Sequence, residues 1–112
     1  MTIIGYLFLG VAFGLATAPA ASALADGDFT LTIRDHKYEP TELVIPANTK
    51  VKLTVKNLDS TAEEFESFDL NREKVVGGGA QIEVFVGPLA AGKYEFFGDF
   101  HQDTARGHLV VQ

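Results

Sequence analysis

Three groups of histidine and acidic residues are the part of this sequence most able to carry out chemistry. In chain order they are His36, then Glu63, Glu64 and Glu66, and then Asp99, His101, Asp103 and His108 near the C-terminus. Imidazole nitrogens and carboxylate oxygens bind Cu(II), Fe, Mn and Zn, whereas Cu(I) prefers sulfur ligands. The residue types therefore predict a metal site with nitrogen and oxygen ligands.

Several other chemistries are excluded by composition. The chain has no Cys, so it has neither a thiolate nor a disulfide. The glycines at residues 77–79 lack the Lys-Ser/Thr of a phosphate-binding loop, and we interpret them as a turn. With 9 Lys and Arg against 15 Asp and Glu, the formal net charge is −6. This charge argues against a nucleic-acid partner.

Residues 1–25 have the features of a secretory signal peptide. They carry no charged side chain, are apolar in the middle and end in small residues. The small residues at Ala23 and Ala25 predict cleavage after Ala25, and a cut after Ala23 is an alternative. An uncleaved membrane anchor is the other alternative. We therefore expect an exported protein with one domain at residues 26–112.

The domain shows the alternation of apolar and polar residues that is typical of β-strands. We expect strands at residues 29–33, 41–46, 51–56, 64–68, 74–76, 82–86, 93–98 and 107–112. About seven strands in this length, with turns every ten residues or so, indicate an all-β sandwich of two sheets. An open barrel is the competing fold.

Residues 89–94 (LAAGKY) favour the sandwich over the barrel. Leu-x-x-Gly-x-Tyr is the pattern of a tyrosine corner, in which the phenol bonds back to the preceding backbone. We expect Tyr94 to bond to backbone near Leu89 and to fix a Greek-key crossover. The alternative is an ordinary tyrosine at the edge of the core.

The strand at residues 64–68 must position the central glutamates. Glu64 and Glu66 are two residues apart, so they share one face of an extended strand. Carboxylates on one face repel each other unless they are solvated or neutralised by a cation. A register change of one residue would turn Glu63 to that side instead.

The order of these features resembles the cupredoxins. Residues 35–47 (DHKYEPTELVIPA) are similar to the opening of that family, and residues 51–57 (VKLTVKN) to the strand before its first ligand loop. Residues 94–101 (YEFFGDFH) resemble the Tyr-x-Phe-x-Cys-x-x-His segment that carries two copper ligands. The resemblance implies a Greek-key β-sandwich of the cupredoxin type.

This sequence departs from the cupredoxin pattern at the copper ligands. Gly98 stands at the Cys position, Glu63 or Glu64 at the first His position, and no Met follows His101. A blue copper centre needs the thiolate. The site has therefore either been lost or been rebuilt from other ligands, and we favour rebuilding.

The resemblance places the two histidines at the same end of the fold as the glutamates, and from it we predict a ligand set. The predicted ligands are His36, Glu64, Glu66 and His101, with Glu63, Asp99 and Asp103 as supporting or alternative ligands. The two aspartates flank His101 and are candidates to fix its ring.

Each of these ligands has a simpler alternative. His36 is an exposed loop histidine in that interpretation, His101 orders its own loop, and the glutamates are solvated. We expect His108 to be exposed on the last strand.

A narrower resemblance concerns residues 63–67 (EEFES), 72–76 (REKVV), 87–89 (GPL) and 96–105 (FFGDFHQDTA). These strings are similar to cupredoxin-like proteins associated with bacterial iron permeases and to the cupredoxin domain of periplasmic iron-uptake lipoproteins. The resemblance implies a periplasmic protein that binds copper or iron and binds, oxidises or hands over ferrous iron. Its partners would be an inner-membrane iron permease and other periplasmic uptake components. The alternative is a metal-free interaction or assembly domain that keeps the sandwich.

Overall fold

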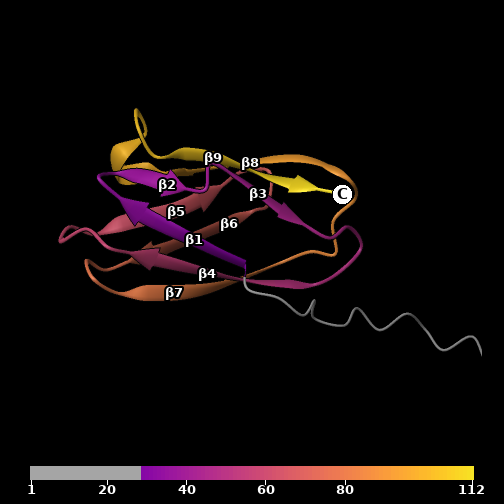
Figure 1. The fold of residues 1–112 in the computed structure, drawn as a ribbon, viewed down its shortest axis with the longest axis horizontal. Coiled ribbons are helices and arrows are strands. Elements are labelled where there is room, and N and C mark those ends of the chain that lie inside the picture. Colours follow the sequence, from indigo (N-terminus) through magenta and orange to yellow (C-terminus); the bar gives the residue numbers. More distant parts are fainter. Residues whose placement is uncertain (1–28) are drawn as a thin grey trace, which may run out of the picture.

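The computed structural model describes residues 29–112, whose strands form two sheets packed face to face (Figure 1). One sheet has four strands in the order β2-β1-β4-β7, and the other has five in the order β3-β9-β8-β5-β6. The predicted two-sheet, all-β sandwich is therefore confirmed. The predicted signal peptide at residues 1–25 and the first three residues of the predicted domain lie outside the described part.

The described residues form nine strands and one short 3-10 helix. These are β1 (Phe29–Arg34), β2 (Lys37–Glu39), β3 (Glu42–Ile45), β4 (Val51–Asn57), β5 (Glu63–Ser67), β6 (Arg72–Val76), β7 (Gln81–Val86), β8 (Gly92–Gly98), η1 (Asp99–His101) and β9 (Arg106–Val111). Every expected strand is present, with ends that differ by at most two residues. The three-residue strand β2 was not expected.

The sandwich forms because alternate residues of each strand are apolar and face the other sheet. In β4, for example, Val51, Leu53 and Val55 are fully buried, while Lys52 and Lys56 are exposed. Their burial removes apolar surface from water, which stabilises the fold.

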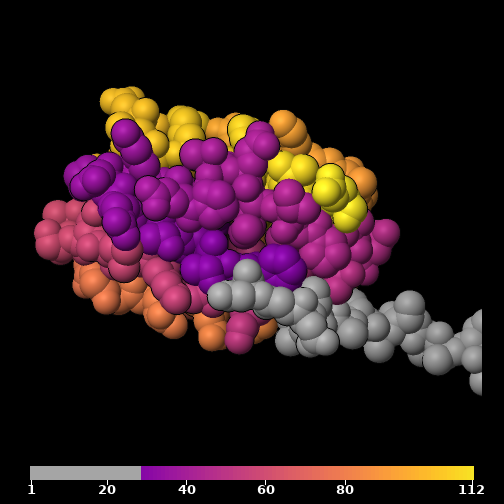
Figure 2. All heavy atoms as spheres, viewed as in Figure 1, coloured from indigo at the N-terminus to yellow at the C-terminus, as the bar shows by residue number. Residues whose placement is uncertain are grey.

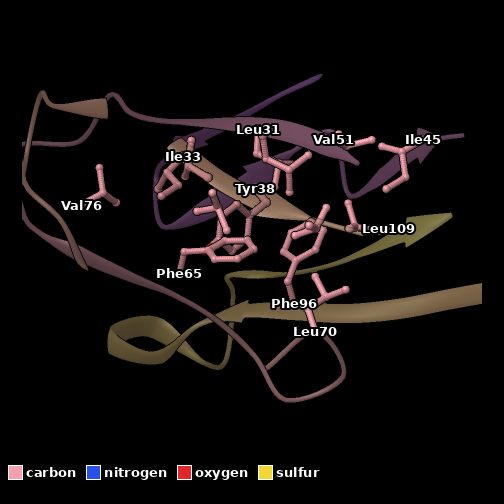
Figure 3. Close-up of a cluster of buried hydrophobic side chains, with 14 of the residues drawn as sticks. Leu31, Ile33, Tyr38, Ile45, Val51, Phe65, Leu70, Val76, Phe96 and Leu109 are labelled. Atoms are coloured by element: carbon pink, nitrogen blue, oxygen red, sulfur yellow. The ribbon is translucent and has the colours of Figure 1, made fainter. Parts of the chain in front are cut away.

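Three aromatic rings form the centre of the core (Figure 3). The ring centroids of Tyr38 and Phe96 are 4.9 Å apart in an edge-to-face contact, and those of Phe65 and Phe96 are 5.6 Å apart. Such contacts add to the stabilisation from burial alone. The core thus holds the sheets together in a chain without disulfides.

The predicted tyrosine corner is also present. The Tyr94 hydroxyl donates a hydrogen bond of 2.8 Å to the carbonyl of Ala90, four residues earlier. Tyr94 lies in β8, whereas the preceding strand β7 belongs to the other sheet. The bond therefore fixes the connection that crosses between the sheets.

Three connections meet at one end of the sandwich, away from the C-terminus (Figure 1). They are the turn between β1 and β2, the loop from β4 to β5, and η1 with the turn that follows it. In the space-filling view the indigo and magenta N-terminal strands cover most of one face, and yellow C-terminal residues line its upper edge (Figure 2). Within residues 29–112 no helix is long and apolar enough to cross a membrane.

Candidate functional site

Strand β5 carries three glutamates and turns them to opposite sides of its sheet. Glu63 is only 1% exposed and shares the inward side of the strand with the core residue Phe65. Glu64 and Glu66 are partly exposed and lie on the outer face. It is therefore Glu63 that faces the interior.

Glu63 contacts three donor positions at the end of the sandwich. Its Oε1 accepts hydrogen bonds from the backbone N–H of Glu64 at 3.0 Å and of Phe100 at 2.9 Å. Its Oε2 lies 2.5 Å from Nδ1 of His101. Burial, and to a smaller extent the charge of Glu63, raise the pKa of the Tyr38 phenol far above its usual value.

Gly98 provides the space that the Glu63 carboxylate occupies. A Cβ atom at Gly98 would lie 2.5 Å from Cδ of Glu63 and 2.8 Å from Cβ of Ala105, which is closer than such atoms approach. Gly98 is also the residue at the Cys position of the cupredoxin pattern. A carboxylate from the neighbouring strand β5 thus fills volume that a cysteine side chain would need.

His36 reaches the same place from the turn between β1 and β2. Its ring is stacked on that of His101, with centroids 3.5 Å apart and planes inclined by 14°. The backbone N–H groups of Asp35 and His36 donate to the two carboxylate oxygens of Asp59, at 2.8 and 3.0 Å. The Thr104 hydroxyl donates to the carbonyl of His36 at 2.6 Å. These contacts hold the His36 turn beside His101.

The Asp59 carboxylate lies close to both the turn and the imidazoles. Its pKa lies below the usual value, chiefly because it accepts the hydrogen bond from the N–H of His36, with that of Asp35 and the nearby imidazoles adding. Partial desolvation of the carboxylate opposes this effect. Its Oδ2 is 4.0 Å from Nε2 of His36, and Thr61 Oγ1 is 3.4 Å from the same nitrogen.

A second group, of three carboxylates, lies on the outer face of β5 and at the start of η1. Glu64, Glu66 and Asp99 each offer an oxygen within 4.8 Å of the other two, and no other such group of three His, Asp or Glu occurs within residues 29–112. Desolvation, then the charge of Glu73, a hydrogen bond with Glu66 and the charges of Asp99 and Glu66 raise the pKa of Glu64 to about 7. A bound cation would offset this repulsion. We name these three residues the carboxylate triad.

The four ligands predicted from the sequence therefore fall into two groups. His36 and His101 lie together at the end of the sandwich, where the carboxylate beside them is Glu63. Glu64 and Glu66 point to the outer face because alternate residues of a strand point to opposite sides. The two groups are joined by the peptide bond between Glu63 and Glu64.

The two aspartates that flank His101 are not in contact with its ring. Asp99 belongs to the carboxylate triad and accepts a hydrogen bond of 2.8 Å from the Gln102 side chain. Asp103 is exposed. The group that holds the His101 ring is Glu63. His108 is partly buried in β9, more so than expected.

Glu63 was predicted only as a supporting or alternative ligand, and Asp59 and Thr104 were not predicted as site residues. A usable signal for Glu63 was present, because it lies two residues from Phe65, the aromatic residue of its strand. No comparable signal marks Asp59, which contacts backbone 23 and 24 residues away.

These residues do not fit a blue copper centre. The chain has no Cys, its single Met is Met1, and the Glu63 carboxylate occupies the space beside Gly98. The donors at the end of the sandwich are instead two imidazoles and a carboxylate, a set that suits Cu(II). The oxygen donors of the carboxylate triad suit harder cations.

Several solved cupredoxins share this fold. An oxidized mutant of amicyanin has a TM-score of 0.62 at 21% identity, and the match covers 79% of this chain and 85% of the amicyanin chain. Auracyanin A, a blue copper protein from Chloroflexus aurantiacus, has a TM-score of 0.64 at 16% identity, covering 77% and 98%. A purple cupredoxin from Nitrosopumilus maritimus has 0.60 at 24%, covering 76% and 100%. At these identities the likeness concerns the fold alone.

Sequence comparison identifies the family. The chain is 52% identical over 81 residues, 72% of its length, to Uncharacterized protein RP394 of Rickettsia prowazekii (strain Madrid E), and it spans 65% of that protein's length. Residues 5–111 match the family described as Cupredoxin-like domain. Because this match extends over nearly the whole sequence, the chain belongs to the cupredoxin-like domain family.

Proposed function

We propose that this protein is a periplasmic metal-binding component of a bacterial ferrous-iron uptake system. In this proposal it binds copper and iron through nitrogen and oxygen ligands and hands iron to an inner-membrane permease. The observation that supports the proposal is that β5 and η1 together place imidazole and carboxylate side chains on both sides of one sheet. Glu63 and His101 lie at the end of the sandwich, and the carboxylate triad lies on the outer face.

We propose that the two groups bind different metals. We propose that His36 and His101 bind Cu(II), for which imidazole is a preferred ligand, while Glu63 holds the His101 ring. We propose that Glu64, Glu66 and Asp99 bind iron, since a hard ion prefers carboxylate oxygens. The raised pKa of Glu64 is consistent with this assignment: desolvation is its largest cause, and the remainder includes repulsion by neighbouring carboxylates, which a cation would relieve.

The role in iron uptake is supported by the sequence strings at residues 63–67 and 96–105. These strings resemble cupredoxin-like proteins associated with iron permeases, and they contain all three residues of the carboxylate triad as well as Glu63 and His101. The resemblance and the ligand geometry thus concern the same residues.

Metal titration of the chelator-treated protein tests the proposed function. We expect Cu(II) to bind with a dissociation constant of about micromolar or tighter. We expect His101→Ala to weaken Cu(II) but not Fe(II), and the double variant E64Q/E66Q to weaken Fe(II) but not Cu(II). The exposed Asp103→Asn serves as the control for loss of a negative charge. Failure of both metals to bind more tightly than about micromolar would contradict the proposal.

Anaerobic mixing of the Cu(II)-loaded protein with Fe(II) then separates oxidation from transfer. One Cu(II) accepts one electron from one Fe(II), giving Cu(I) and Fe(III), so oxidation would abolish the Cu(II) EPR signal. An unchanged signal would leave a protein that binds and hands over iron without oxidising it.

A metal-free interaction domain is the second candidate function, and one observation favours it. Within residues 29–112 no buried side-chain nitrogen or oxygen lacks a hydrogen-bond partner, and Glu63 is satisfied by its three donors. The same titration decides between the two functions, since this candidate requires that no metal binds.

A further inference from the structure

We infer that Asp59 is a positioning residue, which holds the His36 imidazole in place over His101. The inference deepens the proposed function, on which it rests for the role of His36 as a copper ligand. The placement of the His36 ring over His101 by Asp59 does not depend on a metal, so it can be measured in the metal-free protein.

The His36 turn has a backbone conformation that needs outside support. Asp35 and His36 have φ angles of 53° and 57°, in the left-handed region that residues other than glycine seldom adopt. The Asp59 carboxylate places one oxygen on each of their N–H groups, at 2.8 and 3.0 Å. One side chain thus satisfies both donors of the strained turn and favours the conformation that points the imidazole toward His101.

Asp59 is itself held in place by the loop between β4 and β5. Its N–H donates to Oδ1 of Asn57 at 3.0 Å, and its carbonyl accepts from the N–H of Gly79 at 2.9 Å. Asn57 is 1% exposed and donates to the carbonyls of Thr61 and Gly77, at 2.8 and 3.2 Å. A fixed carboxylate can therefore impose its geometry on the more exposed turn.

The other side of the turn is tied to the segment that carries His101. Thr104 donates its hydroxyl to the His36 carbonyl, and the N–H groups of Thr104 and Ala105 both donate to the His101 carbonyl, at 3.2 and 2.8 Å. Movement of the His36 turn is thereby coupled to His101, and the two rings stay stacked.

Asp59 also influences which ring nitrogen of His36 faces a metal. Both Asp59 Oδ2 and Thr61 Oγ1 lie on the Nε2 side of the ring. At 4.0 Å the Asp59 oxygen is beyond hydrogen-bond distance of Nε2, so it acts on this side of the ring through its charge. A carboxylate near the second nitrogen is the usual support of a metal-bound histidine, and its loss typically lowers metal affinity 10- to 100-fold.

A double-mutant cycle with Cu(II) alone as the probe tests the inference. We expect Asp59→Ala to weaken Cu(II) binding by about 10- to 100-fold and to have no further effect in a His36→Ala background. Glu39→Ala removes an exposed carboxylate of β2 and serves as the charge control. If the effects of Asp59→Ala and His36→Ala multiply, Asp59 does not act through His36 and the inference is wrong.

A measurement on the metal-free protein keeps the inference testable if the proposed function fails. NOEs between the ring protons of His36 and His101 report the stack directly. We expect them in the parent protein and in Glu39→Ala, and we expect Asp59→Ala to lose them while the core signals stay unchanged. Retention of these NOEs in Asp59→Ala would overturn the positioning role. If His36→Ala leaves Cu(II) affinity unchanged, the copper assignment fails, and the NOEs still decide the role of Asp59.

Discussion

Glu63 is a buried acid whose contacts all lie within one small region of the fold. It joins the start of β5 to η1 through Phe100 and His101, and it has almost no exposure to water. A buried carboxylate is tolerated when its oxygens are hydrogen-bonded and an imidazole stands next to it. The same arrangement fixes the orientation of the His101 ring, as the proposed metal site requires.

Replacement of Glu63 by Gln should destabilise the protein. The amide oxygen can keep both backbone N–H groups, but the amide NH2 group then faces His101 Nδ1, so the charge-assisted contact is lost or the ring must take its other tautomer. We expect Glu63→Gln to lower the free energy of unfolding by about 1–3 kcal/mol. The control Asp103→Asn, at an exposed position, should change it by no more than about 0.5 kcal/mol. Urea unfolding of chelator-treated protein measures both, and equal effects would contradict the account.

Gly98 should tolerate no side chain while Glu63 is present. The Cβ atom of Gly98→Ala would overlap Cδ of Glu63, so we expect a loss of about 1–3 kcal/mol. In a Glu63→Ala background that loss should shrink, with only the contact to Ala105 remaining. The control Gly77→Ala places its Cβ 3.8 Å from the nearest side chain and should be nearly neutral. Additive effects of Gly98→Ala and Glu63→Ala would show that the two positions are independent.

The sequence alone predicted the residue types of the site better than their directions. The composition of residues 63–66 predicted metal ligands. Which glutamate points inward could be predicted only from Phe65, whose aromatic side chain indicates the buried side of the strand. The clamp of Asp59 on His36 depends on side chain to backbone contacts between distant loops. Such contacts have no local pattern, so they could not be predicted.

At the scale of elements, β5 separates two chemical environments by the alternation of its side chains. Its inward side contributes Glu63 to a buried site, and its outer side contributes Glu64 and Glu66 to an acidic surface. The strand pairs with β6 on one side and with β8 on the other, so Asp99 and Glu73 come close to the same surface. One strand thus serves both proposed metal groups.

The acidic surface of β5 should make stability depend on pH. The pKa of Glu64 is raised from 4.5 to about 7, so between these values the folded state binds more protons than the unfolded state. The contribution of Glu64 to the free energy of unfolding therefore falls as pH rises from about 4.5 to 7. We expect Glu64→Gln to remove this part of the pH dependence in chelator-treated protein. Urea unfolding at several pH values in this range measures the free energy of unfolding of both proteins. The prediction is wrong if this free energy depends on pH equally in the parent protein and in Glu64→Gln.

Strand positions were predictable, whereas strand partners were not. Alternation is a local property, so runs such as residues 82–86 indicate a strand without further information. The parallel pairings of β1 with β4 and of β3 with β9 join distant segments and depend on the whole fold. Strand β2 was not predicted because only Tyr38 of its three residues is buried.

At the scale of the whole molecule, a cysteine-free sandwich supports an end at which two imidazoles and a buried carboxylate lie together. The core between the sheets provides the stability, so the connections at that end are free to carry charged residues. The formal charge of −6 favours the approach of cations over anions. The fold is that of a cupredoxin, while Gly98 stands at the Cys position and the Glu63 carboxylate occupies the space beside it.

EPR and absorption spectra of the Cu(II)-loaded protein test this central claim most directly. We predict one tightly bound Cu(II) with hyperfine coupling to imidazole nitrogen, reduced in His36→Ala and in His101→Ala, and no intense thiolate band. A lack of binding tighter than about micromolar, or a spectrum that neither histidine substitution alters, would contradict a metal site built from imidazole and carboxylate.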